Sequence, residues 1–292
     1  MYINILMNFY ISKILPFISL LTLIYQLFFD LYFHSTIEKM INIPFLTVIK
    51  YISLVIYFLS IFSFIKTSMT EPGYVMHQTN KIFLEFYQKT RQISITRANK
   101  FNRKYNLKTN NSNKDNNKND NALQCEHCNV MQIYRIITHC SICSNCIYMK
   151  DHHCMWLNQC IGQFNIKYYI LFLFYLLVGS YISILECYYF VSKNYIKIII
   201  EYSLIQKIYL FAFSIFGIIH IILSIKLLYD QYINLDYYSV LYDKSNEIIE
   251  IRNKYEIVCE YFGEKFGISW FFPIKAGGYY LLFQHIKILK KE

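Results

Sequence analysis

Four long apolar segments dominate the chain, and each is long enough to cross a lipid bilayer. They cover residues 14–33, 45–65, 168–191 and 208–225, and a helix needs about 20 residues to span the hydrocarbon core. Each segment must be helical there, because hydrocarbon offers no water to the N–H and C=O groups of the backbone. The pattern therefore predicts a mainly α, polytopic membrane protein with four transmembrane helices.

Lysine and arginine are unevenly distributed among the loops, and this predicts the orientation of the chain. The stretch 66–167 holds 14 of them and the tail after residue 225 holds nine, whereas the loops 34–44 and 192–207 hold one and three. Loops rich in Lys and Arg stay on the cytosolic side of a membrane. We therefore expect the long loop and both termini in the cytosol. We expect the membrane to be that of the Golgi or another endomembrane, although the sequence does not specify the organelle.

The composition agrees with a membrane protein. Hydrophobic residues make up 55% of the chain and charged residues 16%, whereas soluble domains carry about 25% charged residues. The net charge of +10 would suggest nucleic acid as a partner in a soluble protein. Here the basic residues flank apolar segments, so we expect the headgroups of the lipid bilayer as their partners and no nucleic acid.

These features divide the chain into five consecutive parts. The linker between the second segment and the cysteine-rich region contains a polar, Asn- and Lys-rich insertion at 106–121 that we expect to be disordered. The tail ends in an amphipathic stretch at 279–291 that predicts a helix lying on the headgroups. The expected parts are an N-terminal segment with helices one and two (1–65), the cytosolic linker (66–124), a cysteine-rich domain (125–167), helices three and four (168–225) and a cytosolic tail (226–292).

Seven of the nine cysteines lie between Cys125 and Cys160, together with four histidines. Such clustering on the cytosolic side indicates metal binding rather than disulfides. A tetrahedral zinc site takes four of these ligands, and a Cys-x2-Cys pair lets two thiolates reach one ion. The cluster therefore predicts two structural zinc ions with some residues left over. Spacing alone leaves open which residues bind which ion and which cysteine stays free.

An acid, a base and a nucleophile stand within four residues at Asp151, His152 and Cys154. The thiolate is the reactive form of cysteine, and a neighbouring histidine lowers its pKa or accepts its proton. A carboxylate bonded to that histidine fixes its tautomer. The grouping favours a catalytic thiol, and the alternative is that Cys154 is a metal ligand or an inert thiol.

At Asp151-His152-His153-Cys154 the sequence resembles the DHHC protein S-acyltransferases, also called palmitoyltransferases. The two apolar segments before the cysteine-rich region and the two after it are similar to the family's arrangement. Further similar positions are Glu71-Pro72-Gly73, Trp156, Asn158, Cys160, Gly162, Asn165, Phe262-Gly263 and Trp270-Phe271-Phe272-Pro273.

The resemblance implies a role for each residue of the cluster. Cys154 would be the nucleophile that carries the acyl group, His152 its base and Asp151 the residue that orients the base. The fold implied is a zinc-braced cysteine-rich domain on the cytosolic face of the membrane. The metal ligands implied are Cys125, Cys128, His139 and Cys146 for one zinc, and Cys140, Cys143, His153 and Cys160 for the other.

The activity implied is transfer of a long-chain acyl group, such as palmitoyl, from acyl-CoA to cysteines of membrane-associated proteins. The family also implies that a residue part-way down the third span, near Gly179 and Ser180, influences the length of the acyl chain that is preferred.

The sequence departs from the family at Met155, where proline is usual, and at Gln159, and it lacks the Thr-Thr-x-Glu motif after the fourth span. The alternatives are a non-catalytic zinc-braced scaffold and, more remotely, a membrane ubiquitin ligase of the RING type.

Overall fold

The structure is a computed structural model, and it describes residues 2–40, 44–75, 125–128, 137–242, 248–251, 253–263 and 266–274. The insertion at 106–121 and the helix predicted at 279–291 lie outside these ranges. The main elements are α1 (Tyr2–Met40), α2 (Pro44–Met69), β1 (Ile137–Cys140), β2 (Asn145–Tyr148), β3 (His152–Cys154), β4 (Gln159–Ile161), α4 (Ile166–Ile200), α5 (Leu204–Ser239), β5 (Val240–Tyr242), β6 (Ile248–Ile251), α6 (Lys254–Phe262) and the 3-10 helix η2 (Ile268–Phe271).

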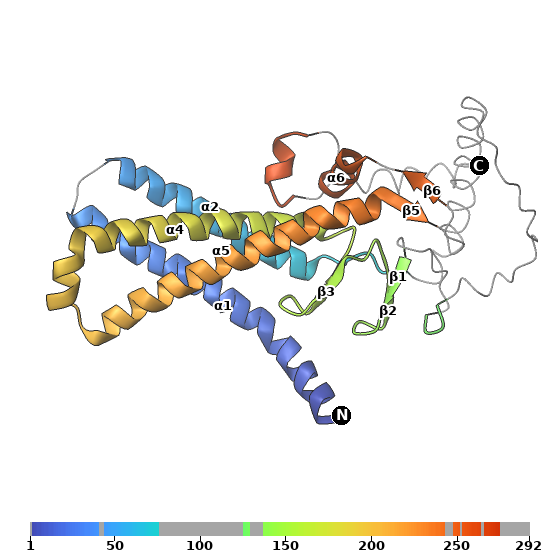
Figure 1. The fold of residues 1–292 in the computed structure, drawn as a ribbon, viewed down its shortest axis with the longest axis horizontal. Helices are drawn as coiled ribbons and strands as arrows, with labels where there is room; N and C mark the ends of the chain where they lie inside the picture. The colour runs from blue at the N-terminus through green and yellow to red at the C-terminus, as the bar shows by residue number, and fades with distance from the viewer. Residues whose placement is uncertain are drawn as a thin grey trace, which may run out of the picture.

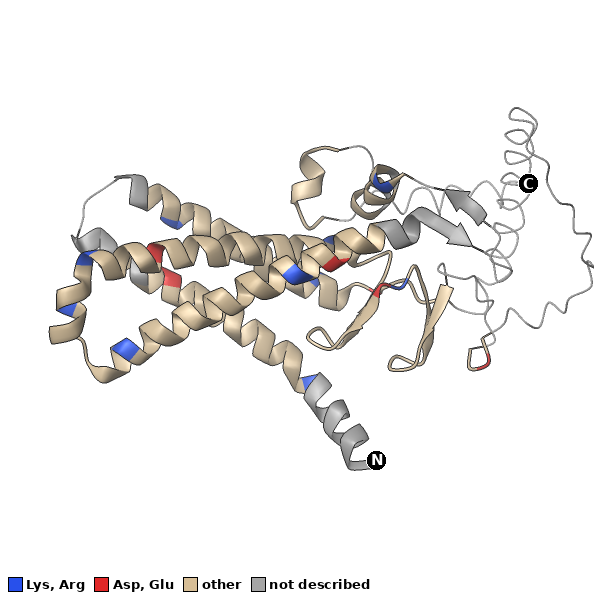
Figure 2. Cartoon of the chain, viewed as in Figure 1, with Lys and Arg blue, Asp and Glu red and all other residues tan. Residues whose placement is uncertain are grey.

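The prediction of four membrane-crossing helices is confirmed within the described residues. The apolar stretches long enough to span a bilayer are Lys13–Tyr32, Thr47–Met69, Ile166–Ile200 and Leu204–Leu235. The four long helices form one elongated bundle, with strands β1 to β3 at one end of it (Figure 1). Charged residues are sparse along these helices (Figure 2), as burial in hydrocarbon requires.

The last span is longer than the sequence pattern predicted. We expected it to end at residue 225, but α5 continues to Ser239 and its apolar stretch to Leu235. The extra turns are stabilised by packing, since Leu227, Leu228 and Leu235 contact the main hydrophobic core. A hydropathy pattern does not predict the part of a helix that extends beyond the bilayer, because contacts with other parts of the protein stabilise that part.

Small and polar side chains hold the helices together within the bundle. Gly179 of α4 allows Tyr57 of α2 to approach closely, because a Cβ at Gly179 would lie 3.4 Å from the Tyr57 ring. The Tyr57 hydroxyl bonds Ser183 Oγ (2.7 Å), and Ser183 donates to Asp30 Oδ1 (2.8 Å). Buried polar groups of this kind replace the missing hydrophobic driving force between helices in a membrane.

The end of the bundle carries two antiparallel hairpins, β1–β2 and β3–β4. The Glu71-Pro72-Gly73 segment joins them to α2, since the amide of Tyr148 donates to the Gly73 carbonyl (2.9 Å). Gly73 has φ of +111°, a backbone conformation that favours glycine. The segment therefore fixes the hairpins against the helix end.

Asn165 ties the hairpins to two helices at once. It is fully buried, and its side-chain amide donates to the carbonyls of Cys160 (2.9 Å) and of Thr70 (3.3 Å), just beyond the end of α2. Its Oδ1 accepts from the Gly162 amide (2.9 Å). Since Asn165 directly precedes α4, one side chain aligns the start of α4 with the end of α2.

Candidate metal centres and thiol site

Two groups of four cysteine and histidine side chains come together in the hairpin region. In each group, one possible ligand atom from every residue lies within 4.8 Å of those of the other three, and either group could hold a metal ion. The first group consists of Cys125, Cys128, His139 and Cys146, and the second of Cys140, Cys143, His153 and Cys160. These are the two sets that the family resemblance implied.

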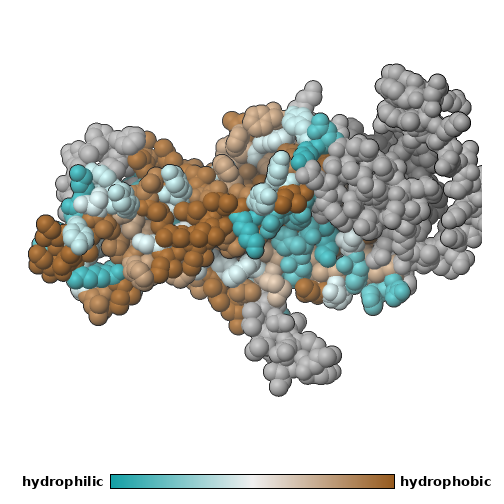
Figure 3. All heavy atoms as spheres, viewed as in Figure 1, coloured by the Kyte–Doolittle hydropathy of each residue, from teal (hydrophilic) through white to brown (hydrophobic). Residues whose placement is uncertain are grey.

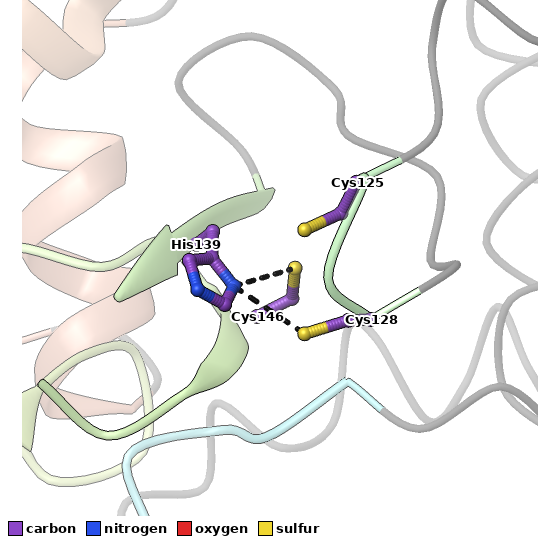
Figure 4. Close-up of side chains that lie close together, drawn as sticks. All are labelled: Cys125, Cys128, His139 and Cys146. Atoms are coloured by element: carbon purple, nitrogen blue, oxygen red, sulfur yellow. Dashed lines mark hydrogen bonds between the residues drawn. The ribbon is translucent and has the colours of Figure 1, made fainter. Parts of the chain in front are cut away.

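The first group joins a separate turn to the β1–β2 hairpin. His139 Nδ1 lies 3.3 Å from Cys128 Sγ and 3.9 Å from Cys146 Sγ. The side chains of all four residues converge on one space (Figure 4). His139 and Cys146 are direct cross-strand partners, so the hairpin itself presents two of the four ligands.

The second group joins the two hairpins. His153 Nδ1 lies 3.3 Å from Cys143 Sγ and 3.5 Å from Cys160 Sγ, and it lies 3.9 Å from Cys140 Sγ. Three thiols and one imidazole form a donor set that suits tetrahedral zinc. The residues of both groups therefore fit a structural zinc ion.

The alternation of side chains along a β-strand explains how residues adjacent in sequence belong to different sites. Successive side chains of a β-strand point to opposite faces. In β1 this sends His139 to the first group and Cys140 to the second. In β3 it turns His153 toward the second group, while His152 and Cys154 share the opposite face.

Cys154 is the one cysteine of the 125–160 cluster that belongs to neither group. It is buried, with 6% of its surface exposed. It packs in the main core with Leu157 and Tyr169. The turn after it is closed by the amide of Leu157, which donates to the Cys154 carbonyl (3.2 Å). This thiol is thus kept apart from the sulfurs that could bind metal.

His152 connects the thiol to a carboxylate. Its Nδ1 lies 2.8 Å from Asp151 Oδ2, which leaves Nε2 for Cys154. Burial alone would lower the pKa of His152, but hydrogen bonds to Asp151 and to Cys154 raise it to about 9. Tyr169 of α4 packs edge-on against the imidazole, with ring centroids 5.4 Å apart. The three side chains form a chain of contacts from carboxylate to imidazole to thiol.

Two residues of α5 complete this arrangement, and the sequence analysis did not identify them. Gln231 Nε2 donates to Asp151 Oδ2 (2.6 Å), and Asn234 Nδ2 donates to Asp151 Oδ1 (2.5 Å). Both carboxylate oxygens of Asp151 are therefore bonded from the membrane helix. The only signal in the sequence was a pair of amides three residues apart, the spacing that puts two side chains on one face of a helix.

An apolar cavity of about 250 Å³ opens beside Cys154 and runs between the helices. Cys154 and Trp156 lie in its wall together with Tyr169 at the start of α4. Its other lining residues are largely aliphatic or aromatic side chains from α1, α2, α4 and α5, among them Leu23, Phe64, Leu173, Leu176 and Leu223. Such a cavity suits a flexible apolar ligand whose reactive end reaches the thiol.

Comparison with known proteins shows which family part of the chain resembles. The family model described as DHHC palmitoyltransferase matches residues 118–246. The match covers less than half of the chain, and this part of the chain is similar to the DHHC palmitoyltransferases. Similar proteins include Palmitoyltransferase ZDHHC15A of Danio rerio (46% identical over 54 residues), Probable protein S-acyltransferase 14 of Arabidopsis thaliana (47% over 51) and Palmitoyltransferase erf2 of Schizosaccharomyces pombe (45% over 53).

Each of these alignments covers 18% of this chain. The same alignments cover 16%, 16% and 15% of the respective relatives. The similarity to these relatives is therefore concentrated in a short part of the DHHC-type domain.

Two departures from the DHHC-type pattern have a structural counterpart. Gln159 donates its side-chain amide to the Thr70 carbonyl (2.6 Å), so it ties β4 to the end of α2. The Thr-Thr-x-Glu motif is absent after the fourth span, and in this chain Gln231 and Asn234 of α5 bond Asp151. Gly179, expected near the cavity, is not among its lining residues and faces α2 instead.

Proposed function

We propose that this chain is a protein S-acyltransferase that carries a long-chain acyl group on Cys154. The observation that carries the proposal is the position of this thiol. It lies outside both possible zinc groups, it contacts the His152–Asp151 pair, and it borders an apolar cavity between the membrane helices. The names of the relatives, palmitoyltransferase and protein S-acyltransferase, support the same reaction.

The reaction would proceed in two thioester exchanges. In the first, the Cys154 sulfur attacks the carbonyl carbon of acyl-CoA, the bond from that carbon to the CoA sulfur breaks, and His152 passes the proton from Cys154 to the departing CoA. In the second, His152 accepts the proton of a substrate cysteine, whose sulfur attacks the carbonyl carbon of the acyl-enzyme. The bond from that carbon to the Cys154 sulfur breaks, and His152 returns the proton to Cys154. Asp151 holds the imidazole in the tautomer that keeps Nε2 toward the thiol. Since thioester exchange changes little in free energy, activation and positioning supply the catalysis.

The membrane would deliver and hold the acyl chain. Each methylene removed from water contributes about 0.8 kcal/mol, so a long chain partitions strongly into the apolar cavity beside Cys154. The protein substrates would be membrane-associated proteins with cysteines on the cytosolic side. We assign the hairpin end of the bundle and both termini to that side, from the distribution of Lys and Arg among the loops.

The two zinc ions would act as structural braces. Cys125, Cys128, His139 and Cys146 would hold one, and Cys140, Cys143, His153 and Cys160 the other. Each set supplies four protein ligands and so leaves no open position for a substrate. Their contribution is to fix β3, and with it the relative positions of His152 and Cys154.

A labelling experiment tests this function. The protein is purified in detergent and incubated with radiolabelled palmitoyl-CoA, and we expect a protein-bound label that hydroxylamine releases, as it does a thioester. The label should vanish in Cys154→Ser and persist in Cys187→Ser and Cys259→Ser, which change cysteines outside the site. A well-folded, zinc-loaded protein that takes up no label would contradict the proposal and favour the non-catalytic scaffold.

A further inference from the structure

The segment 266–274, which we call the wedge, exposes an unusual number of large apolar side chains. It follows α6 and contains η2. Five of its side chains are exposed, and Ile268 leaves 80% of its surface uncovered. Soluble surfaces rarely expose a contiguous apolar patch of this kind. The exposed members are Phe266, Ile268, Phe271, Phe272 and Ile274.

The wedge is attached to the side of a membrane helix. Lys167 of α4 donates from Nζ to the Ser269 carbonyl (2.9 Å), and Tyr175 of α4 donates its hydroxyl to the Phe271 carbonyl. The wedge follows α6 in the chain, and the red-orange turn in Figure 1 lies beside the helical bundle rather than beside strands β1 and β2. Hydrophobic surface covers both the helices and this turn (Figure 3).

The depth of this attachment follows from the helix contacts. Asn165, at the start of α4, bonds the carbonyl of Thr70, so it is level with the end of the apolar stretch of α2 at Met69. Tyr175 is ten residues further along α4, which is about 15 Å deeper along the helix axis. Its side chain leans back toward the helix start, and so the Phe271 carbonyl lies within the leaflet nearer the hairpins.

Several backbone groups of the wedge are bonded to protein groups, as this depth in the bilayer demands. Non-helical backbone is tolerated in a bilayer only where protein groups satisfy its N–H and C=O. The carbonyls of Ser269 and Phe271 accept bonds from α4. The amide of Trp270 donates to the Gly267 carbonyl (3.0 Å). These backbone groups thus face protein, while five apolar side chains face outward.

We propose that residues 266–274 are inserted in the hydrocarbon of the leaflet nearer the hairpins, with lipid acyl chains as their partner. The wedge continues the lipid-facing surface of α4, where Phe174, next to Tyr175, is also exposed. Its insertion anchors α6, whose Ile257 and Tyr261 pack in the same core as Cys154. The wedge is therefore linked, through α6, to the hydrophobic core that contains Cys154.

Tryptophan fluorescence tests the insertion directly, because the chain has only two tryptophans, Trp156 and Trp270. Both are changed to phenylalanine, and Ile268→Trp then places a single reporter at the most exposed position of the wedge. Two matched reporters calibrate it: Phe58→Trp, 65% exposed on α2 within the bilayer, and Ile142→Trp, 60% exposed in the β1–β2 turn. Each protein is reconstituted in phosphatidylcholine vesicles with brominated acyl chains.

We expect the reporter at residue 268 to lose fluorescence in brominated vesicles, as the reporter at 58 does, and to resist aqueous iodide. The reporter at 142 should show the reverse. A reporter at 268 that iodide quenches as fully as at 142, with no loss in brominated vesicles, would overturn the proposal and indicate a water-facing surface. The measurement is independent of acyl transfer, so an inactive protein would leave its result unchanged.

Discussion

Asn234 of α5 donates its side-chain amide to Asp151, 83 residues earlier in the chain, across 2.5 Å. Gln231 bonds the other oxygen of the same carboxylate. Asp151 in turn bonds His152. A membrane helix thereby determines the orientation of the carboxylate, and through it the direction in which the imidazole faces the thiol.

Removing either amide should slow acylation of Cys154. A hydrogen bond to a charged group contributes about 1.5–3 kcal/mol, and about 1.4 kcal/mol corresponds to a tenfold change in rate. We therefore expect Asn234→Ala and Gln231→Ala each to lower the single-turnover rate of acyl-enzyme formation about tenfold or more. Rapid-quench measurement of the hydroxylamine-sensitive label at saturating palmitoyl-CoA gives this rate.

Control variants distinguish a general structural defect from the loss of the hydrogen bonds that position Asp151. Gln206→Ala removes an amide from the other end of the same helix and should keep the wild-type rate. The isosteric Asn234→Asp should be slower than Asn234→Ala, since it sets a second carboxylate against Asp151. Equal rates for Asn234→Ala and wild type, with intact zinc content, would refute the positioning role.

The two groups of ligands predict how many zinc ions each protein chain binds, and which cysteine substitutions lower that number. Wild-type protein should contain two zinc ions per chain, one for each group. Cys140→Ser should lose the second zinc and reduce the yield of folded protein, because binding of structural zinc contributes directly to the free energy of folding. Plasma mass spectrometry of the purified protein measures the metal. Cys154→Ser and Cys187→Ser should both retain two ions, and a loss of zinc from Cys154→Ser would assign this thiol to a metal instead.

The sequence predicted the parts of this fold that depend on local pattern or on counting ligands. Hydropathy located four spans, because lipid imposes a length and composition on each. The DHHC-type resemblance divided the cysteines into two sets, which the structure brings together as two groups. The contacts of Gln231 and Asn234 with Asp151 could not be predicted, because they depend on how far α5 extends beyond the bilayer. That extension is determined by tertiary packing of residues such as Leu235.

Asn165 should contribute strongly to stability, because it is fully buried and bonds two separate segments, the 160–162 stretch and the end of α2. Asn165→Ala leaves the carbonyls of Cys160 and Thr70 without this donor. The penalty for an unsatisfied buried group is about 1–3 kcal/mol, so we expect the free energy of unfolding to fall by roughly 2–3 kcal/mol. Thermal unfolding in detergent, followed by circular dichroism, should show a clear decrease in the midpoint, with Ile222→Ala, at a position 63% exposed on the lipid-facing side of α5, nearly unchanged. An unchanged midpoint for Asn165→Ala would show that the junction is held by other contacts.

The deep end of the cavity is closed by polar groups from three helices. The His220 Nδ1–H donates to Gln26 Oε1 (2.7 Å), and Gln26 Nε2 donates to Ser180 Oγ (3.3 Å). Gln26 and Ser180 lie about one turn beyond Leu23 and Leu176, which line the cavity from α1 and α4. Ser180 is eleven residues from Tyr169, near the thiol, which corresponds to about 16 Å along α4.

The methyl end of a bound acyl chain should stop at this polar layer, because an apolar chain gains nothing from entering it and would break its hydrogen bonds. His220→Ala removes the only imidazole among the described residues that line the cavity and should shift the preferred acyl-CoA toward longer chains. Competition between acyl-CoAs of graded length for labelling of Cys154 measures the preference. Ile222→Ala, on the lipid-facing side of the same helix and 63% exposed, should leave the preference unchanged. If His220→Ala is acylated with the wild-type chain preference, the layer does not limit chain length, and the limit must lie nearer the thiol.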